Sequence, residues 1–76
     1  MKEQIYKILM SKAVSEKEEA LTTLKLLCEY PAGIGDHSTS DFYQNAEEAL
    51  TKLVDSEDKI SILEKYQDRL FTKKIK

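Results

Sequence analysis

Apolar residues recur through the first half of the chain at the spacing of an amphipathic helix. Residues 2–30 contain neither Gly nor Pro, and the main apolar positions are three, four or seven residues apart. Such intervals place side chains on one face of a helix. The predicted face consists of Val14, Leu21, Leu24 and Cys28, with Leu27 beside it, and an earlier, less regular part formed by Ile5, Ile8, Leu9 and Ala13.

One tetrapeptide leaves the number of helices in this half open. The run Ser15-Glu16-Lys17-Glu18 matches a capping box, in which a serine oxygen and a glutamate three residues later satisfy free amides at a helix start. A break there gives two helices, at about 3–12 and about 16–29, with boundaries uncertain by a few residues. One unbroken helix with a solvent-facing serine is the alternative, and the pattern favours neither.

The second half has a more regular, heptad-like pattern. Residues 40–72 again lack Gly and Pro, which indicates one long helix. Two pairs, Glu48–Lys52 and Asp55–Lys59, have the favourable order for ion pairs along a helix. Phe42, Leu50, Val54 and Phe71 widen the apolar stripe, which itself comprises Ala46, Ala49, Leu53, Ser56, Ile60, Leu63, Gln67 and Leu70. The polar members Ser56 and Gln67 are expected to fix helix register.

Residues 31–40 hold every Pro, Gly and His of the 76-residue chain. Tyr30 precedes Pro31 and is therefore disfavoured in a helix, so the first half ends there. Glycines allow a tight reversal, and the run of Ser, Thr and Asp from Ser38 to Asp41 supplies helix caps. We therefore predict an all-α antiparallel hairpin in a single domain, residues 1–76, with a hinge loop at 31–40.

Self-association is expected to complete this fold into a helical bundle. A chain of 8.8 kDa buries only a modest core, and a single cysteine excludes an internal disulfide. A hairpin also leaves aromatic and apolar residues uncovered unless a second copy packs on it. The predicted interface is the second-half stripe: Ala46, Ala49, Leu53, Ile60, Leu63 and Leu70. A compact three-helix monomer is the alternative.

Enzymatic chemistry finds little support in these residues. Cys28 lies on the apolar stripe, and His37 could reach it only if the loop folded back. Adjacent carboxylates such as Glu47 and Glu48 point in different directions on a helix. One Cys and one His cannot supply a zinc site. We predict a non-enzymatic protein without metal or cofactor.

Two binding functions remain as alternatives to protein binding. Free amides around Gly33 and Gly35, with Asp36, His37 and Ser38, could bind a nucleotide or another small anion, although a structural turn explains these residues better. The lysines near the C-terminus, Lys73, Lys74 and Lys76, could contact nucleic acid. A net charge of −2 gives no general attraction to nucleic acid, and cations also stabilise a helix C-terminus.

The charge pattern and the lack of long apolar runs predict a soluble cytoplasmic protein. No run approaches the roughly 18 apolar residues of a membrane helix, and the N-terminus lacks the apolar core of a signal peptide. A lone cysteine fits a reducing compartment.

Residues 34–66 resemble small helical proteins of T4-like tailed phages, notably those infecting marine cyanobacteria. The resemblance is carried by four segments: Ile34-Gly35-Asp36-His37-Ser38, Asn45-Ala46-Glu47-Glu48-Ala49-Leu50, Asp55-Ser56-Glu57-Asp58-Lys59 and Leu63-Glu64-Lys65-Tyr66. Such proteins bring no assigned activity or catalytic residues. The resemblance implies a phage accessory protein made in the host cytoplasm that binds a host or phage protein or sequesters a small molecule.

Overall fold

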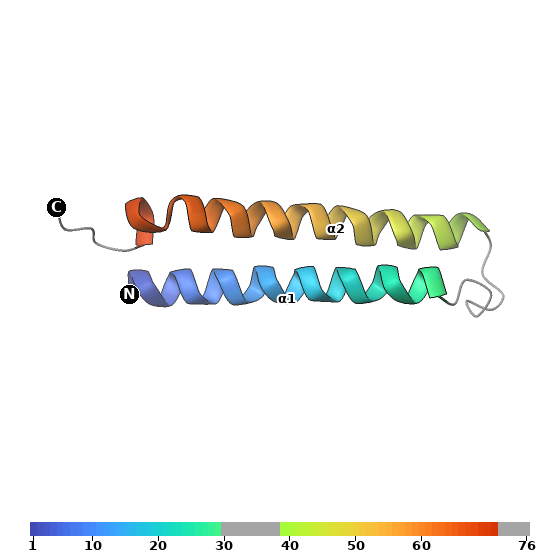
Figure 1. The fold of residues 1–76 in the computed structure, drawn as a ribbon, viewed down its shortest axis with the longest axis horizontal. Helices are drawn as coiled ribbons and strands as arrows, with labels where there is room; N and C mark the ends of the chain where they lie inside the picture. Colours follow the sequence, from blue (N-terminus) through green and yellow to red (C-terminus); the bar gives the residue numbers. More distant parts are fainter. Residues whose placement is uncertain (30–38, 72–76) are drawn as a thin grey trace.

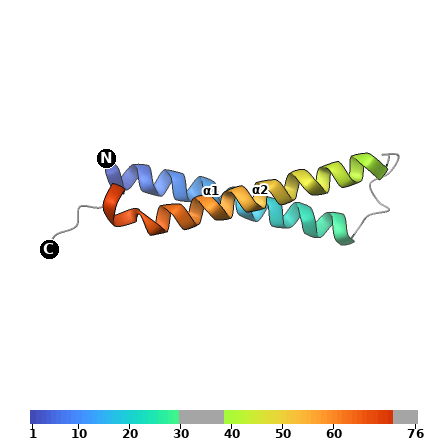
Figure 2. The same ribbon diagram turned by 90° about the horizontal axis from the view of Figure 1, so that it is seen from above.

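A computed structural model of the chain describes residues 1–29 and 39–71. Two long helices, α1 (Lys2–Glu29) and α2 (Thr39–Lys65), lie side by side and antiparallel, and a short π-helix, η2 (Gln67–Phe71), follows α2. Figures 1 and 2 show the two helices in contact along their length, crossing at a shallow angle, with the start of α1 and η2 at the same end of the hairpin. The predicted all-α antiparallel hairpin is confirmed.

α1 is a single helix through the capping-box sequence. Ser15 lies in its middle and is exposed to solvent. A capping serine stands outside the helix that it caps, so this one caps nothing. Of the two arrangements that the sequence left open, the structure has the unbroken helix.

The face of α1 that packs on α2 differs from the predicted face. Of the predicted residues, Ala13 and Leu27 are buried and Leu24 is half-buried, as predicted. The other predicted residues are exposed: Ile5, Ile8, Leu9, Val14, Leu21 and Cys28. Ala20, which was not predicted, is buried one position before Leu21. Apart from the half-buried Glu16, the least exposed positions recur in alternating steps of four and three: Tyr6, Met10, Ala13, Lys17, Ala20, Leu24 and Leu27. Hydrophobicity favoured Val14 and Leu21, but the neighbouring Ala13 and Ala20 lie in the seam, where their small side chains permit a close approach.

The face of α2 agrees with the predicted heptad pattern as far as Leu63. Its least exposed residues are Phe42, Ala46, Ala49, Leu53, Ser56, Ile60 and Leu63. Together with the corresponding α1 positions they form the seam between the helices. On both helices the alternating steps of three and four are those of an antiparallel coiled coil.

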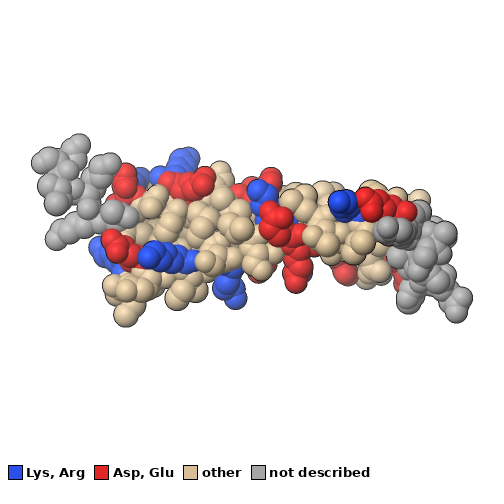
Figure 3. All heavy atoms as spheres, turned by 60° about the horizontal axis from the view of Figure 1, so that its bottom comes forward, with Lys and Arg blue, Asp and Glu red and all other residues tan. Residues whose placement is uncertain are grey.

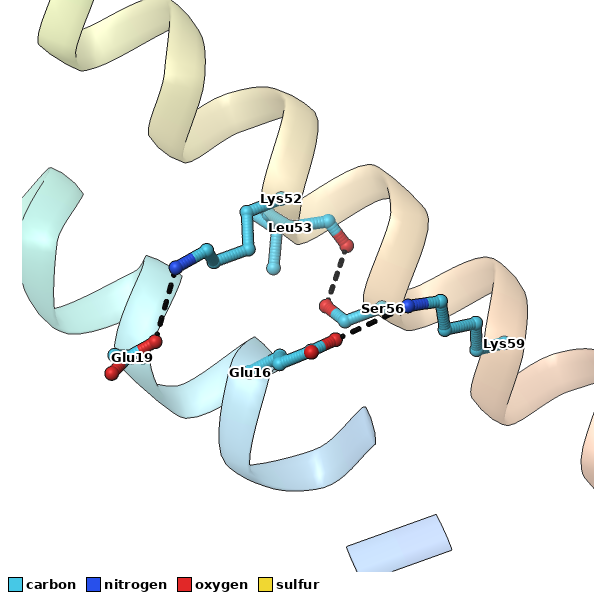
Figure 4. Close-up of polar contacts among 6 residues, drawn as sticks. All are labelled: Glu16, Glu19, Lys52, Leu53, Ser56 and Lys59. Atoms are coloured by element: carbon cyan, nitrogen blue, oxygen red, sulfur yellow. Dashed lines mark hydrogen bonds and ion pairs between the residues drawn. The ribbon is translucent and has the colours of Figure 1, made fainter. Parts of the chain in front are cut away.

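Small residues occupy the deepest positions of the seam. Ala13 and Ala20 on α1, and Ala49 and Ser56 on α2, are buried at intervals of seven residues. The Ser56 hydroxyl donates a hydrogen bond to the Leu53 carbonyl oxygen at 3.0 Å, within its own helix (Figure 4). This bond satisfies the buried hydroxyl without a partner on α1, so serine serves here as a small seam residue.

The predicted second helix, about 40–72, changes form near its end. α2 begins at Thr39, inside the predicted loop range 31–40, and stops at Lys65. The i→i+5 turn of η2 holds more residues per turn than an α-helix. This shift leaves Gln67 and Leu70 exposed, contrary to the predicted stripe, and brings the Phe71 ring to within 5.4 Å of the Tyr6 ring, between centroids.

The hairpin is long and thin. Its two helices, of 28 and 27 residues, each span about 40 Å at 1.5 Å per residue, and only these two lie side by side in the described part of the chain. The described residues thus build one seam between two helices, with much surface left outside it.

Candidate functional site

The seam divides the hairpin surface into two flanks of different character. On one side, which we call the charged flank, two ion pairs join the helices. Lys52 Nζ lies 3.1 Å from Glu19 Oε1, and Lys59 Nζ lies 3.3 Å from Glu16 Oε1. Figure 4 shows both lysines reaching from α2 across to α1. The sequence had predicted that these lysines pair along α2, but their carboxylate partners lie on α1.

Shallow hollows on the charged flank are lined mainly by polar side chains. One, of about 230 Å³, is bordered by Thr23, Asn45 and Glu48, with Lys52. A second, of about 280 Å³, includes Glu48, Asp55 and both lysines of the ion pairs. Within residues 1–29 and 39–71, no group of acidic, His or Cys side chains is arranged to hold a metal ion. The charges of this flank are exposed to solvent, so salt screens them. The described residues of the flank do not form an enclosed ligand site.

The opposite side, which we call the apolar flank, carries Val14, Leu21, Leu50 and Val54, all of them exposed. The Lys17–Glu57 ion pair, 3.9 Å between Nζ and Oε2, shows that these four residues share a side. Val14 and Leu21 lie three residues before and four residues after Lys17. Leu50 and Val54 lie seven and three residues before Glu57. Residues three, four or seven apart lie on the same face of a helix, so the α1 residues lie on the face of Lys17 and the α2 residues on the face of Glu57.

A separate apolar groove lies nearer the chain ends, on the charged-flank side. It has a volume of about 290 Å³ and is lined by Leu9, Ile62 and Leu63, together with Asp58 and Lys59. Leu9 and Ile62 are 42% and 52% exposed. We call this the terminal groove. In the face drawn in Figure 3, charged side chains near the middle separate two stretches of uncharged surface.

The residues predicted as an oligomer interface lie mostly in the seam. Ala49 and Leu63 are buried, and Ala46, Leu53 and Ile60 are half-buried, so α1 already covers much of this stripe. Leu70 is 57% exposed and stays available for contacts. Whether any of these residues also contacts a second copy stays a prediction. The sequence analysis assigned Leu21 to the face of α1 that packs on α2. In the structure Leu21 is exposed on the apolar flank.

The proposed ligand residues Gly33, Gly35, Asp36, His37 and Ser38 lie outside the described residues. So do Lys73, Lys74 and Lys76 of the basic C-terminus. The described part of that region holds Lys65 and Arg69, whose charged groups lie 5.5 Å and 5.7 Å from the Tyr66 ring centroid. Both distances are within the range of cation–π contacts.

Comparison with protein-family models, with curated proteins and with solved structures found no match. In the described part of the chain, neither long helix has an apolar stretch sufficient to cross a membrane.

Proposed function

We propose that this chain is a non-enzymatic protein-binding protein that acts through exposed apolar helix surfaces and self-associates. The observation that carries the proposal is the exposure of large apolar side chains after the seam has formed. Leu21, Leu50 and Val54 on the apolar flank, and Leu9 and Ile62 at the terminal groove, remain at least 40% exposed. Exposed apolar patches on a small soluble protein commonly mark contact sites for other proteins.

The two surfaces differ in what they can bind. The terminal groove has aliphatic walls and two charged residues, Asp58 and Lys59, at its edge. A hydrophobic floor with a polar rim is the usual composition of a protein contact site. We assign this groove to the partner protein, because an amphipathic helix laid along it can bury one apolar face against Leu9 and Ile62. The resemblance to phage accessory proteins makes a host or phage protein the proposed partner.

Native mass spectrometry of the protein purified from cells that naturally make it tests this function. We expect species that contain a second polypeptide. Ile62→Asp should release that polypeptide, because it places a charge in the groove. Thr22→Asp, an exposed position on α1 away from the groove, is the matched control and should retain it. Species composed only of this chain, whatever their copy number, contradict the proposal. Retention of a nucleotide or nucleic acid in place of a polypeptide contradicts it as well.

A further inference from the structure

We infer that the end of the hairpin opposite the loop can pack in two registers, and that Gln67 selects the one seen in the structure. In the first, which we call the π register, the i→i+5 turn of η2 places Phe71 against Tyr6. In the second, the α register, an uninterrupted α-helix places Leu70 at the end of the seam instead. The inference concerns a conformational switch within the fold and does not depend on the proposed function.

The sequence at the end of the hairpin is compatible with both registers. The heptad stripe of α2 continues beyond the buried Leu63, in steps of four and three, to Gln67 and Leu70. In the structure, the half-buried residues that follow Leu63 are Tyr66 and Phe71. Each register therefore sets one apolar residue at the end of the seam, Leu70 in one and Phe71 in the other.

The backbone of η2 retains hydrogen bonds of the α-helical kind. The Leu70 amide donates to the Tyr66 carbonyl oxygen at 2.9 Å, and the Tyr66 amide donates to the Ile62 carbonyl oxygen at 3.0 Å. Both are i→i+4 bonds, as in an α-helix. They belong to both registers, so a change of register breaks neither of them.

Gln67 is the residue whose surroundings differ most in polarity between the registers. It is exposed in the π register, whereas in the α register it lies in the seam, four residues after the buried Leu63. The antiparallel contact of Tyr6 with Phe71 sets Met10, four residues after Tyr6, opposite position 67. A thioether is a weak hydrogen-bond acceptor, so an amide buried against it loses its bonds to water. Gln67 therefore favours the π register.

The register decides which apolar side chain is presented to solvent, and on which side of the seam. In the structure Leu70 is 57% exposed and lies one position before the seam residue Phe71. Ile62, which lines the terminal groove, likewise lies one position before Leu63, so Leu70 is on the groove side. In the α register Leu70 enters the seam, and Phe71 lies one position after it, as the α2 residues of the apolar flank do. A change of register thus moves the exposed apolar residue from one flank to the other.

Nuclear Overhauser effects (NOEs) in the isotope-labelled full chain test the inference. In wild type, the Tyr6 ring should show NOEs to the Phe71 ring. Gln67→Leu should weaken these NOEs by about tenfold or more and produce NOEs from Tyr6 to the Leu70 methyl groups, because a leucine buried at position 67 stabilises the α register. Arg69→Leu introduces the same side chain at an exposed position of η2 and should keep the wild-type NOEs.

A second substitution shows whether Leu70 is the residue that enters the seam. Leu70→Asp alone should leave the wild-type NOEs unchanged, because Leu70 is exposed in the π register. Added to Gln67→Leu, it should restore the contact of Tyr6 with Phe71, because it buries a charge in the α register only.

Three results overturn the inference. The first is an undiminished contact of Tyr6 with Phe71 in Gln67→Leu. The second is loss of that contact without new NOEs to Leu70, which indicates disruption of the chain end in place of a change of register. The third is an equal loss in Arg69→Leu, which shows that position 67 has no special role.

Discussion

The ring of Tyr6, in the second turn of α1, packs against the ring of Phe71, the last residue of η2. Their centroids are 5.4 Å apart and their planes are inclined by 57°. The contact joins the two ends of the described chain, opposite the loop. It exists because the π-turn delays the rotation of the backbone and carries Phe71 onto the seam in place of Leu70.

Removing either ring should loosen this end of the hairpin. We expect Phe71→Ala and Tyr6→Ala each to lower the free energy of unfolding by about 1–2 kcal/mol, less than a fully buried aromatic would. A double-mutant cycle should give a coupling of about 0.5–1.5 kcal/mol. Urea unfolding at one fixed protein concentration measures both, since association shifts apparent stability. Leu70→Ala is the control and should cost under about 0.5 kcal/mol because Leu70 projects into solvent. Strictly additive effects of the two ring deletions contradict the contact.

Enlarging a small residue in the seam should separate the helices. Ala20 is fully buried in the seam and borders the hollow of about 230 Å³, so three further carbons must displace α2 or extend into that hollow. We expect Ala20→Leu to destabilise the hairpin by about 1–3 kcal/mol, as overpacking does. Thr22→Leu introduces the same leucine side chain at an exposed position of the same helix and should be close to neutral. Thermal unfolding followed by circular dichroism compares the two. A stabilised Ala20→Leu variant would show that the seam is looser than described.

The ion pairs of the charged flank should contribute to register more than to stability. Lys52 and Lys59 are at least half exposed at their side chains, so each bridge to α1 contributes about 0.2–1 kcal/mol and less in high salt. Replacing Glu16 and Glu19 together by Lys should destabilise the hairpin at low salt, through like-charge repulsion. Adding Lys52→Glu and Lys59→Glu should restore stability. Urea midpoints at low and high salt provide the measurement, and a salt-independent loss contradicts the electrostatic origin.

The sequence predicted α2 better than α1, for a physical reason. In α2 the residues of the heptad stripe that are also large, such as Leu53 and Ile60, face α1, so hydrophobicity and burial agree as far as Leu63. In α1 the buried Ala13 and Ala20 each lie one position before a larger, exposed residue, Val14 or Leu21. Small side chains are buried there because they allow the two helices to approach closely. The distance between the helices depends on the partner helix, which no pattern within α1 reveals. The π-turn likewise leaves no hydrophobic signature, so the exposure of Leu70 was not predictable.

Ser56 gives a direct test of how its buried hydroxyl is satisfied. Its Oγ donates to the Leu53 carbonyl of its own helix, and among the described residues no buried side-chain polar atom lacks a partner. Ser56→Ala removes the donor and leaves an intrahelical carbonyl that the helix itself can satisfy. We expect Ser56→Ala to be neutral or to stabilise by up to about 0.5 kcal/mol, given the higher helix propensity of Ala. A loss above about 1 kcal/mol, the usual value of a net hydrogen bond, contradicts this account. Urea unfolding decides between these outcomes.

Substitution of Ser15 distinguishes between the two arrangements that the sequence allowed for the first half, one unbroken helix or two helices. If a helix began at Glu16, Ser15→Ala would remove an N-cap and cost about 1 kcal/mol. In the unbroken α1 the serine is exposed in a helix interior, where Ala is the better residue by a few tenths of a kcal/mol. We therefore expect Ser15→Ala to raise the urea midpoint slightly. Ser11→Ala, at another exposed interior position of α1, is the matched control and should behave in the same way. A destabilised Ser15→Ala beside an unaffected Ser11→Ala would indicate a helix start at Glu16, because only a capping serine loses a hydrogen bond to free amides when its side chain is removed.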